Sequence, residues 1–181
     1  MDKINFFKTA VKELRMVGAL TPSSRYVVKR LKEELGNNSK HIVEYGAGDG
    51  VIVKEILRDL PTNGRYVAIE INPQFLSELH QISDPRLTVL NTDVRSVLKD
   101  GLEDSSPVTT VISGIPFTFF SKNEREEIIQ KTYTLLAPGG KFLVYQVTPL
   151  VYPILKKYFS EVKIRFEPLN IPPYFIMIGK K

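Results

Sequence analysis

The chain has 181 residues, of which 43% are apolar and 25% are charged, and it contains no cysteine and two histidines. This composition is typical of one globular domain, and it excludes a disordered chain, a disulfide scaffold, thiolate metal sites and a histidine-rich metal site. We find no signal-peptide pattern and no apolar run long enough to span a bilayer. We therefore expect a cytoplasmic protein that binds no metal.

The net charge of +5 is concentrated at the N-terminus. Residues 1–32 contain eight Lys or Arg side chains and two acidic ones, whereas the rest of the chain is close to neutral. A basic segment attached to a near-neutral body predicts an anionic partner, either a nucleic acid or an anionic membrane surface.

The segment 2–17 fits an amphipathic helix. Its apolar face spans about 140° at 100° per residue. That face consists of Phe6, Phe7, Ala10, Val11, Leu14 and Val17. A basic helix of this kind is typical of interfacial membrane binding, which would place the protein on the inner face of the membrane. Alternatively, the same face packs against the body of the protein or covers its active site. A second helix is expected over 25–35, capped by the hydroxyls of residues 21–24.

From residue 40 onward, strand-like and helix-like segments alternate. Strands are expected at 41–45, 65–71, 86–91, 108–113, 141–147, 162–167 and 174–179. Helices are expected at 51–60, 73–82 and 121–136, the last one stopped by the Pro-Gly-Gly at 138–140. This alternation predicts an α/β fold whose parallel sheet has helices on both faces. Ligands of such sheets bind beyond the carboxyl ends of the strands.

The loop after the first strand is rich in glycine. Residues 44–50 read Glu-Tyr-Gly-Ala-Gly-Asp-Gly, and glycines at alternate positions let a backbone turn sharply and approach a ligand closely. The third glycine comes one position too early for the dinucleotide pattern G-x-G-x-x-G, which favours a nucleoside ligand without a diphosphate. Alternatively, the loop is only a tight strand-to-helix turn.

Two acidic residues lie at the carboxyl ends of the next two strands. Glu70 ends the second predicted strand, where a carboxylate can accept both hydroxyls of a ribose. Asp93 follows the third predicted strand and could accept a bond from an adenine amino group. Each alone could be a strand-end cap, but a glycine loop and two acidic residues in register indicate a nucleoside cofactor.

With these features the sequence resembles the class I S-adenosylmethionine-dependent methyltransferases. The matching motif positions are Glu44, Gly46, Gly48, Gly50, Glu70 and Asp93. The resemblance implies a Rossmann-like, mostly parallel seven-stranded sheet with an antiparallel last strand, and S-adenosyl-L-methionine as cofactor. It divides the chain into an N-terminal helical part, 1–37, and a methyltransferase domain, 38–181. It also assigns to the cofactor site Ala47, Ile71, Val94, Ser113, Thr21 and Ser24.

The loop after the fourth strand, residues 113–117, lies where this family places the methyl acceptor. Amino-methylating members carry Asn or Asp, then Pro and an aromatic residue, and here Ser113 replaces the amide. A serine can accept a hydrogen bond but lacks the paired geometry of Asn. The candidate catalytic residues are Ser113, Pro116 and Phe117, with Tyr26 as a candidate proton relay. Alternatively, the loop is a rigid turn with a buried Phe117.

A narrower resemblance involves the segments 17–25, 113–116 and 170–173. They are similar to bacterial soluble phospholipid N-methyltransferases, and also to ribosomal RNA adenine methyltransferase-like proteins. The resemblance implies stepwise methylation of phosphatidylethanolamine toward phosphatidylcholine, with an anionic membrane bound through residues 1–17. The alternatives are a methyltransferase acting on RNA adenine or a small amine, and a non-catalytic lipid-binding module that has kept the fold.

Overall fold

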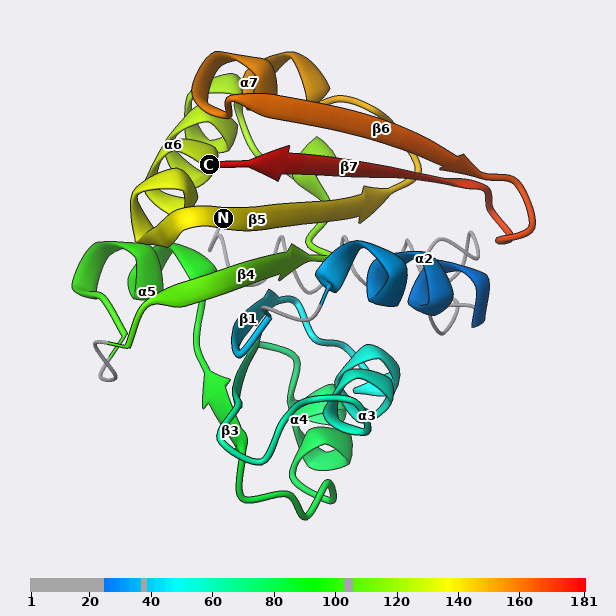
Figure 1. The fold of residues 1–181 in the computed structure, drawn as a ribbon, viewed down its shortest axis with the longest axis vertical. Coiled ribbons are helices and arrows are strands. Elements are labelled where there is room, and N and C mark those ends of the chain that lie inside the picture. The colour runs from blue at the N-terminus through cyan, green and yellow to red at the C-terminus, as the bar shows by residue number, and fades with distance from the viewer. Residues whose placement is uncertain (1–24, 37–38, 103–105) are drawn as a thin grey trace.

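The structure is a computed structural model that describes residues 25–36, 39–102 and 106–181. The expected amphipathic helix over 2–17 lies outside these residues, as do Thr21 and Ser24. Figure 1 shows a twisted sheet with helices packed against it. No helix in the described ranges is both long and apolar enough to cross a bilayer.

Seven strands form one sheet. Their bounds are β1 His41–Tyr45, β2 Arg65–Glu70, β3 Leu87–Asn91, β4 Val108–Ser113, β5 Leu136–Gln146, β6 Glu161–Glu167 and β7 Tyr174–Lys180. The strand order is β3-β2-β1-β4-β5-β7-β6, and β7 runs antiparallel to both of its neighbours. The expected Rossmann-like fold with an antiparallel last strand is confirmed. Since β7 is antiparallel to β5 and β6 is antiparallel to β7, β6 runs in the same direction as β5. The carboxyl end of β6 therefore lies at the same edge of the sheet as those of β1 to β5.

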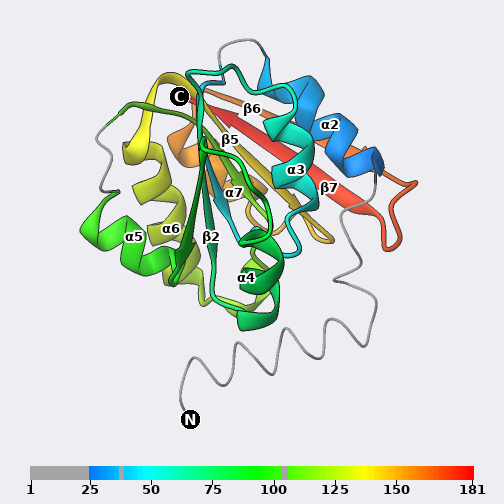
Figure 2. The ribbon, with the colours of Figure 1, turned by 90° about the horizontal axis from the view of Figure 1, so that it is seen from below.

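Helices cover both faces of the sheet. Their bounds are α2 Arg25–Leu35, α3 Val51–Leu57, α4 Pro73–Leu79, α5 Val94–Asp100, α6 Lys122–Leu135 and α7 Tyr152–Tyr158, with a 3₁₀ turn η1 at Phe117–Phe119. Figure 2 shows α2 and α3 on one side of the sheet and α5 and α6 on the other. Alternate side chains along β1 point to opposite faces of the sheet, so Ile42 packs on the side of α2 and α3 and Val43 on the side of α5 and α6.

The turn chemistry of the sequence sets several helix starts. Asn72 caps α4 by accepting from the amide of Gln74, with Pro73 in the first turn as expected. Ser121 and Glu124 form a capping box at the start of α6. Helices α3 and α4 end at Leu57 and Leu79, about one turn earlier than expected.

The region after α6 differs from the sequence-based expectation. The Pro-Gly-Gly at 138–140 does not stop the helix, because α6 already ends at Leu135 and β5 begins at Leu136. Val108 pairs with Leu136 and Thr110 with Lys141, so the segment is an irregularity within the strand. The short elements α5, α7 and η1 were not expected, since one or two turns are too few to show a helical period.

Candidate active site

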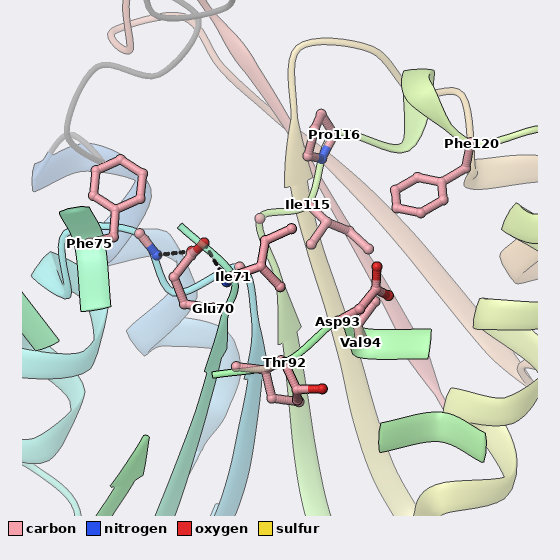
Figure 3. A pocket seen from close by; sticks show the side chains of 13 residues that line it. Glu70, Ile71, Phe75, Thr92, Asp93, Val94, Ile115, Pro116 and Phe120 are labelled. Carbon is pink, nitrogen blue, oxygen red and sulfur yellow. Dashed lines mark hydrogen bonds between the residues drawn. The ribbon is translucent and has the colours of Figure 1, made fainter. Parts of the chain in front are cut away.

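A pocket opens at the carboxyl edge of β1, β2, β3 and β4. It encloses about 610 Å³ of empty space, its open mouth included. Its lining comes from the last two residues of β2 and from the segments that follow the four strands. The lining residues are Gly46, Gly48, Ile69, Glu70, Ile71, Phe75, Thr92, Asp93, Val94, Gly114, Ile115, Pro116 and Phe120. Figure 3 shows Phe75 and Phe120 on opposite sides of it.

The glycine loop forms the wall nearest to β1. Gly48 has φ +56°, and a Cβ at this position would meet nothing within 4 Å, because the residue faces the open space of the pocket. Gly50 has φ +74° and does not line the pocket. A Cβ there would lie 2.9 Å from the side chains of Leu79 and Ile82. Gly48 therefore leaves room for a ligand, and Gly50 lets α3 pack closely against α4.

Glu70 connects the glycine loop to the start of α4. Its Oε2 accepts from the amide of Gly48 at 2.9 Å. Its Oε1 accepts from the amides of Ile71 and Asn72, both at 2.8 Å. A carboxylate can accept about four bonds, so one acceptor position remains, on Oε2. We expected this side chain to accept both hydroxyls of a ribose, and it has room for one such bond.

Asp93 combines a structural role with its place in the pocket. Its Oδ1 caps α5 through the amide of Arg95 at 2.8 Å. The Arg95 side chain also donates to both carboxylate oxygens, through Nε at 2.9 Å and Nη2 at 2.7 Å. Burial alone would raise the pKa of the Asp93 carboxyl, but the bonds from Arg95 outweigh it and hold that pKa below its ordinary value. Asp93 is therefore ionised at neutral pH.

Glu44 lies beneath the pocket and is absent from its lining. The side chain is fully buried, and its Oε2 accepts from the Tyr66 hydroxyl at 2.7 Å. Its Oε1 makes no hydrogen bond within the described residues. Burial raises the pKa of the Glu44 carboxyl to about 8, which the bond from Tyr66 only partly opposes. The proposed cofactor contact of Glu44 stays a prediction.

The loop after β4 places its aromatic residues differently from the expectation. Gly114, Ile115 and Pro116 line the pocket, but the ring of Phe117 is fully buried in the core. The turn η1 directs Phe117 inward, where its carbonyl accepts from Arg125 Nε at 2.8 Å. The ring that reaches the pocket is Phe120, whose centroid is 6.1 Å from that of Phe117. Of the two expectations for Phe117, the one that placed its ring in the core describes the structure.

Several other predicted site residues do not reach the pocket. Ser113 is fully buried under the loop, and its Oγ makes no hydrogen bond within the described residues. Ala47 packs into the core beside α3. The Tyr26 hydroxyl accepts from Arg25 Nη2 at 2.9 Å, at the start of α2. Conversely, sequence reasoning missed Ile69, Phe75, Thr92 and Phe120, whereas Gly114 and Ile115 belong to the loop 113–117 that it named. Of these, Ile69 and Thr92 adjoin the acidic residues that were identified.

The pocket fits the nucleoside part of S-adenosylmethionine. The side chains of Ile71, Phe75 and Val94 offer apolar surface for a flat base, and Glu70 offers a carboxylate acceptor for a ribose hydroxyl. The open space in front of Gly48 lets the ligand approach the backbone. These residues would hold the cofactor between β1, β2 and β3.

The sheet order, the glycine loop and the acidic residues at the carboxyl ends of β2 and β3 together define a class I S-adenosylmethionine-dependent methyltransferase. A family model described as a methyltransferase domain matches residues 42–140, which is more than half of the chain. The chain belongs to this methyltransferase domain family. It is an enzyme whose cofactor is S-adenosyl-L-methionine.

Known proteins of similar sequence and structure agree with this assignment. An ornithine lipid N-methyltransferase from Singulisphaera acidiphila is 29% identical over 165 residues, covering 87% of this chain and 84% of the relative. The 1,6-didemethyltoxoflavin-N1-methyltransferase of Burkholderia thailandensis superposes with a TM-score of 0.73 at 16% identity, covering 98% of this chain and 86% of that one. The N-methyltransferase NodS of Bradyrhizobium japonicum gives 0.70 at 13% identity, covering 88% and 89%. The two structures show the shared fold.

Proposed function

We propose that this protein transfers methyl groups to the amino nitrogen of a membrane lipid. The similarity to an ornithine lipid N-methyltransferase over 87% of this chain and 84% of the relative carries the proposal. Phosphatidylethanolamine, the acceptor expected from the sequence, is also an amine-bearing lipid, so the proposal includes it. The acceptor would enter beside Ile115, Pro116 and Phe120, next to the cofactor site.

The described residues support a mechanism based on positioning. When bound, S-adenosylmethionine supplies a methyl group activated by a sulfonium charge, so the protein need not provide a nucleophile. Before transfer, an acceptor amine would have to give up one proton to solvent so that its lone pair could face this methyl group. The apolar walls at Ile115, Pro116 and Phe120 would desolvate an ammonium group and lower its pKa, exposing its lone pair. Glu70 and Gly48 would hold the nucleoside in line with it.

Membrane contact is part of this proposal. The segment 1–17, which fits a basic amphipathic helix, would attach the protein peripherally to an anionic bilayer.

The acceptor loop would contribute through two residues. Pro116 lines the pocket and would border the acceptor, whereas Ser113 lies beneath the loop and would act through the loop backbone.

The test measures transfer of labelled methyl from S-adenosylmethionine. Vesicles containing anionic lipid and either phosphatidylethanolamine or ornithine lipid are offered in parallel with total RNA. We expect label in the lipid amine, and less of it when residues 1–17 are deleted. Label in RNA alone would overturn the lipid proposal. Cofactor binding with no transfer to any acceptor would instead favour a non-catalytic lipid-binding module.

A further inference from the structure

Large apolar side chains are exposed at the carboxyl edge of the sheet. We call them the apolar rim, which consists of Val147, Leu150, Phe166, Leu169 and Ile171. Ile171 is 81% exposed and Leu169 60%, values that are unusual for side chains of this size at neighbouring positions. The rim is formed by the connection after β5 and by the β6–β7 hairpin.

The apolar rim lies at the same edge as the pocket. Gln146 at the end of β5 pairs with Phe175, which also pairs with Phe166 near the end of β6. The hairpin tip, residues 168–173, therefore extends beyond the end of β5, as Figure 1 shows. Three strand spacings separate β4 from β6, which places the hairpin roughly 14 Å from the acceptor loop.

The two segments that form most of the rim carry no charge. Neither residues 142–155 nor residues 168–178 contain an Asp, Glu, Lys or Arg. A surface without charges can enter a region of low dielectric without the cost of desolvating an ion. The rim therefore differs from an ordinary loop surface, where charged side chains interrupt the apolar ones.

The hairpin tip is held in one shape by its own polar groups. Asn170 is buried, and its Nδ2 donates to the carbonyl of Pro172 at 2.6 Å. Glu167 accepts from the amide of Leu169 at 3.1 Å through Oε1. Asn170 Oδ1 makes no hydrogen bond within the described residues, so these two bonds are the ones that support the tip on which Leu169 and Ile171 are exposed. Binding through them then requires little additional ordering.

Cationic side chains lie beside the hairpin. Glu167 Oε2 accepts from Arg30 Nε at 3.2 Å, which attaches α2 to the end of β6. The first turn of α2 contains no acidic residue, and the side chains of Arg25, in this turn, and of Lys29, just after it, are exposed. Lys29 forms no ion pair with any other residue that the structure describes. An uncharged apolar rim flanked by cations matches an anionic bilayer, whose lipid tails are apolar and whose surface is negative.

We propose that the apolar rim inserts into the headgroup region of an anionic phospholipid bilayer, so that the pocket opens toward the lipid headgroups. This inference rests on the proposed lipid substrate and names the surface on which that substrate is reached. It assigns to Leu169 and Ile171 a membrane contact separate from that proposed for residues 1–17.

The chain contains no tryptophan, so one introduced tryptophan is an unambiguous reporter. Ile171→Trp places this reporter on the rim, and Thr62→Trp places a control at an exposed site before β2, at the opposite edge. Vesicles of phosphatidylcholine and phosphatidylglycerol, with or without brominated acyl chains, contain no amine acceptor. We expect only the rim reporter to shift its emission to shorter wavelength and to be quenched by the brominated lipid.

A second variant tests affinity without the reporter. Leu169→Ser combined with Ile171→Ser should weaken vesicle binding about tenfold or more, because exposed apolar area is lost. Its affinity for S-adenosylhomocysteine should stay unchanged, which shows that the pocket is intact. Equal vesicle binding by this variant and the parent would overturn the proposal.

Other outcomes also decide. A concentration-dependent blue shift of the rim reporter without vesicles would show that a second copy of the chain covers the rim, and would overturn the bilayer assignment. Quenching of the rim reporter without methyl transfer to any lipid would leave the rim proposal standing and overturn the lipid function. Lipid methylation with an unquenched rim reporter would overturn the rim proposal and leave the lipid function standing.

Discussion

The backbone amide of Gly48 donates a 2.9 Å hydrogen bond to the carboxylate of Glu70, 22 positions further along the chain. The other oxygen of the same carboxylate accepts from the amides of Ile71 and Asn72. One buried side chain therefore fixes both the glycine loop and the approach to α4. The two walls of the pocket are held in register without requiring a ligand.

Replacing Glu70 with glutamine should weaken both walls. The glutamine keeps one acceptor oxygen and turns an amide donor toward a backbone N–H, so at least one buried amide loses its partner. We expect the free energy of unfolding to fall by about 2 kcal/mol and the affinity for S-adenosylhomocysteine to fall about tenfold. Denaturant unfolding measures the change in stability, and titration calorimetry measures the change in affinity. Glu161→Gln, at an exposed position of β6, is the control with the same charge change and should alter neither.

Two glycines allow a matched comparison of ligand space. Gly48 and Gly139 both have positive φ, and a Cβ on either would meet nothing within 4 Å, but only Gly48 lines the pocket. Alanine at either position should cost about 1–2 kcal/mol of stability through backbone strain. Only Gly48→Ala should also weaken cofactor binding, measured by calorimetry. Equal cofactor affinities in the two variants would contradict the placement of the ligand against Gly48.

Two phenylalanines that follow β4 should differ in their effect on activity. Phe120→Leu should lower kcat/KM for the acceptor about tenfold, because a wall of the acceptor site is lost. Both rings are buried in the core, so each change should lower the free energy of unfolding by about 1 kcal/mol, but Phe117→Leu should leave kcat/KM close to the parent value because its ring does not line the pocket. Kinetics with variable acceptor and thermal unfolding compare the pair. A larger kinetic defect in Phe117→Leu would reverse the assignment of the two rings.

Local sequence signals predicted most of the cofactor side of the pocket. Gly48, Glu70 and Asp93 follow directly from turn chemistry and from the ends of strands, which depend on neighbouring residues. The acceptor side was harder, because η1 turns Phe117 inward and brings Phe120 to the pocket. That rotation depends on packing against β5 and α6, which a linear pattern does not contain.

The same limit explains the errors elsewhere in the fold. The Pro-Gly-Gly at 138–140 has the composition of a helix stop, but long-range pairing of β4 with β5 places it inside a strand. The depth of Glu44 also depends on the sheet, because its partner Tyr66 belongs to the neighbouring strand β2. The apolar rim was not expected, since its members meet only when β6 and β7 pair.

The pH dependence of stability should report the buried Glu44. Its pKa is raised from 4.5 to about 8, so the folded state binds a proton that the unfolded state releases in this interval. The resulting stability is fully present below about pH 4.5 and is lost as pH rises to about 8. In Glu44→Gln this loss is absent. We expect the Tm of the variant, relative to the parent, to rise from about pH 5 to about pH 8 and then level off.

The exposed Glu161→Gln variant serves as the reference for that series, since its carboxylate lies at the surface. Its Tm should follow the parent at every pH. A Tm difference between Glu44→Gln and the parent that does not change between about pH 5 and about pH 8 would show that Glu44 titrates near its ordinary value.

The direction of β7 determines how the protein can be attached to a sensor surface. Lys180 pairs with Lys141 at the start of the parallel part of β5, whereas Phe175 pairs with Gln146 at its end. A linker joined after Lys181 therefore leaves from the edge opposite the pocket. Molecules tethered in this way would present the pocket and the hairpin tip to vesicles flowing past, in one orientation.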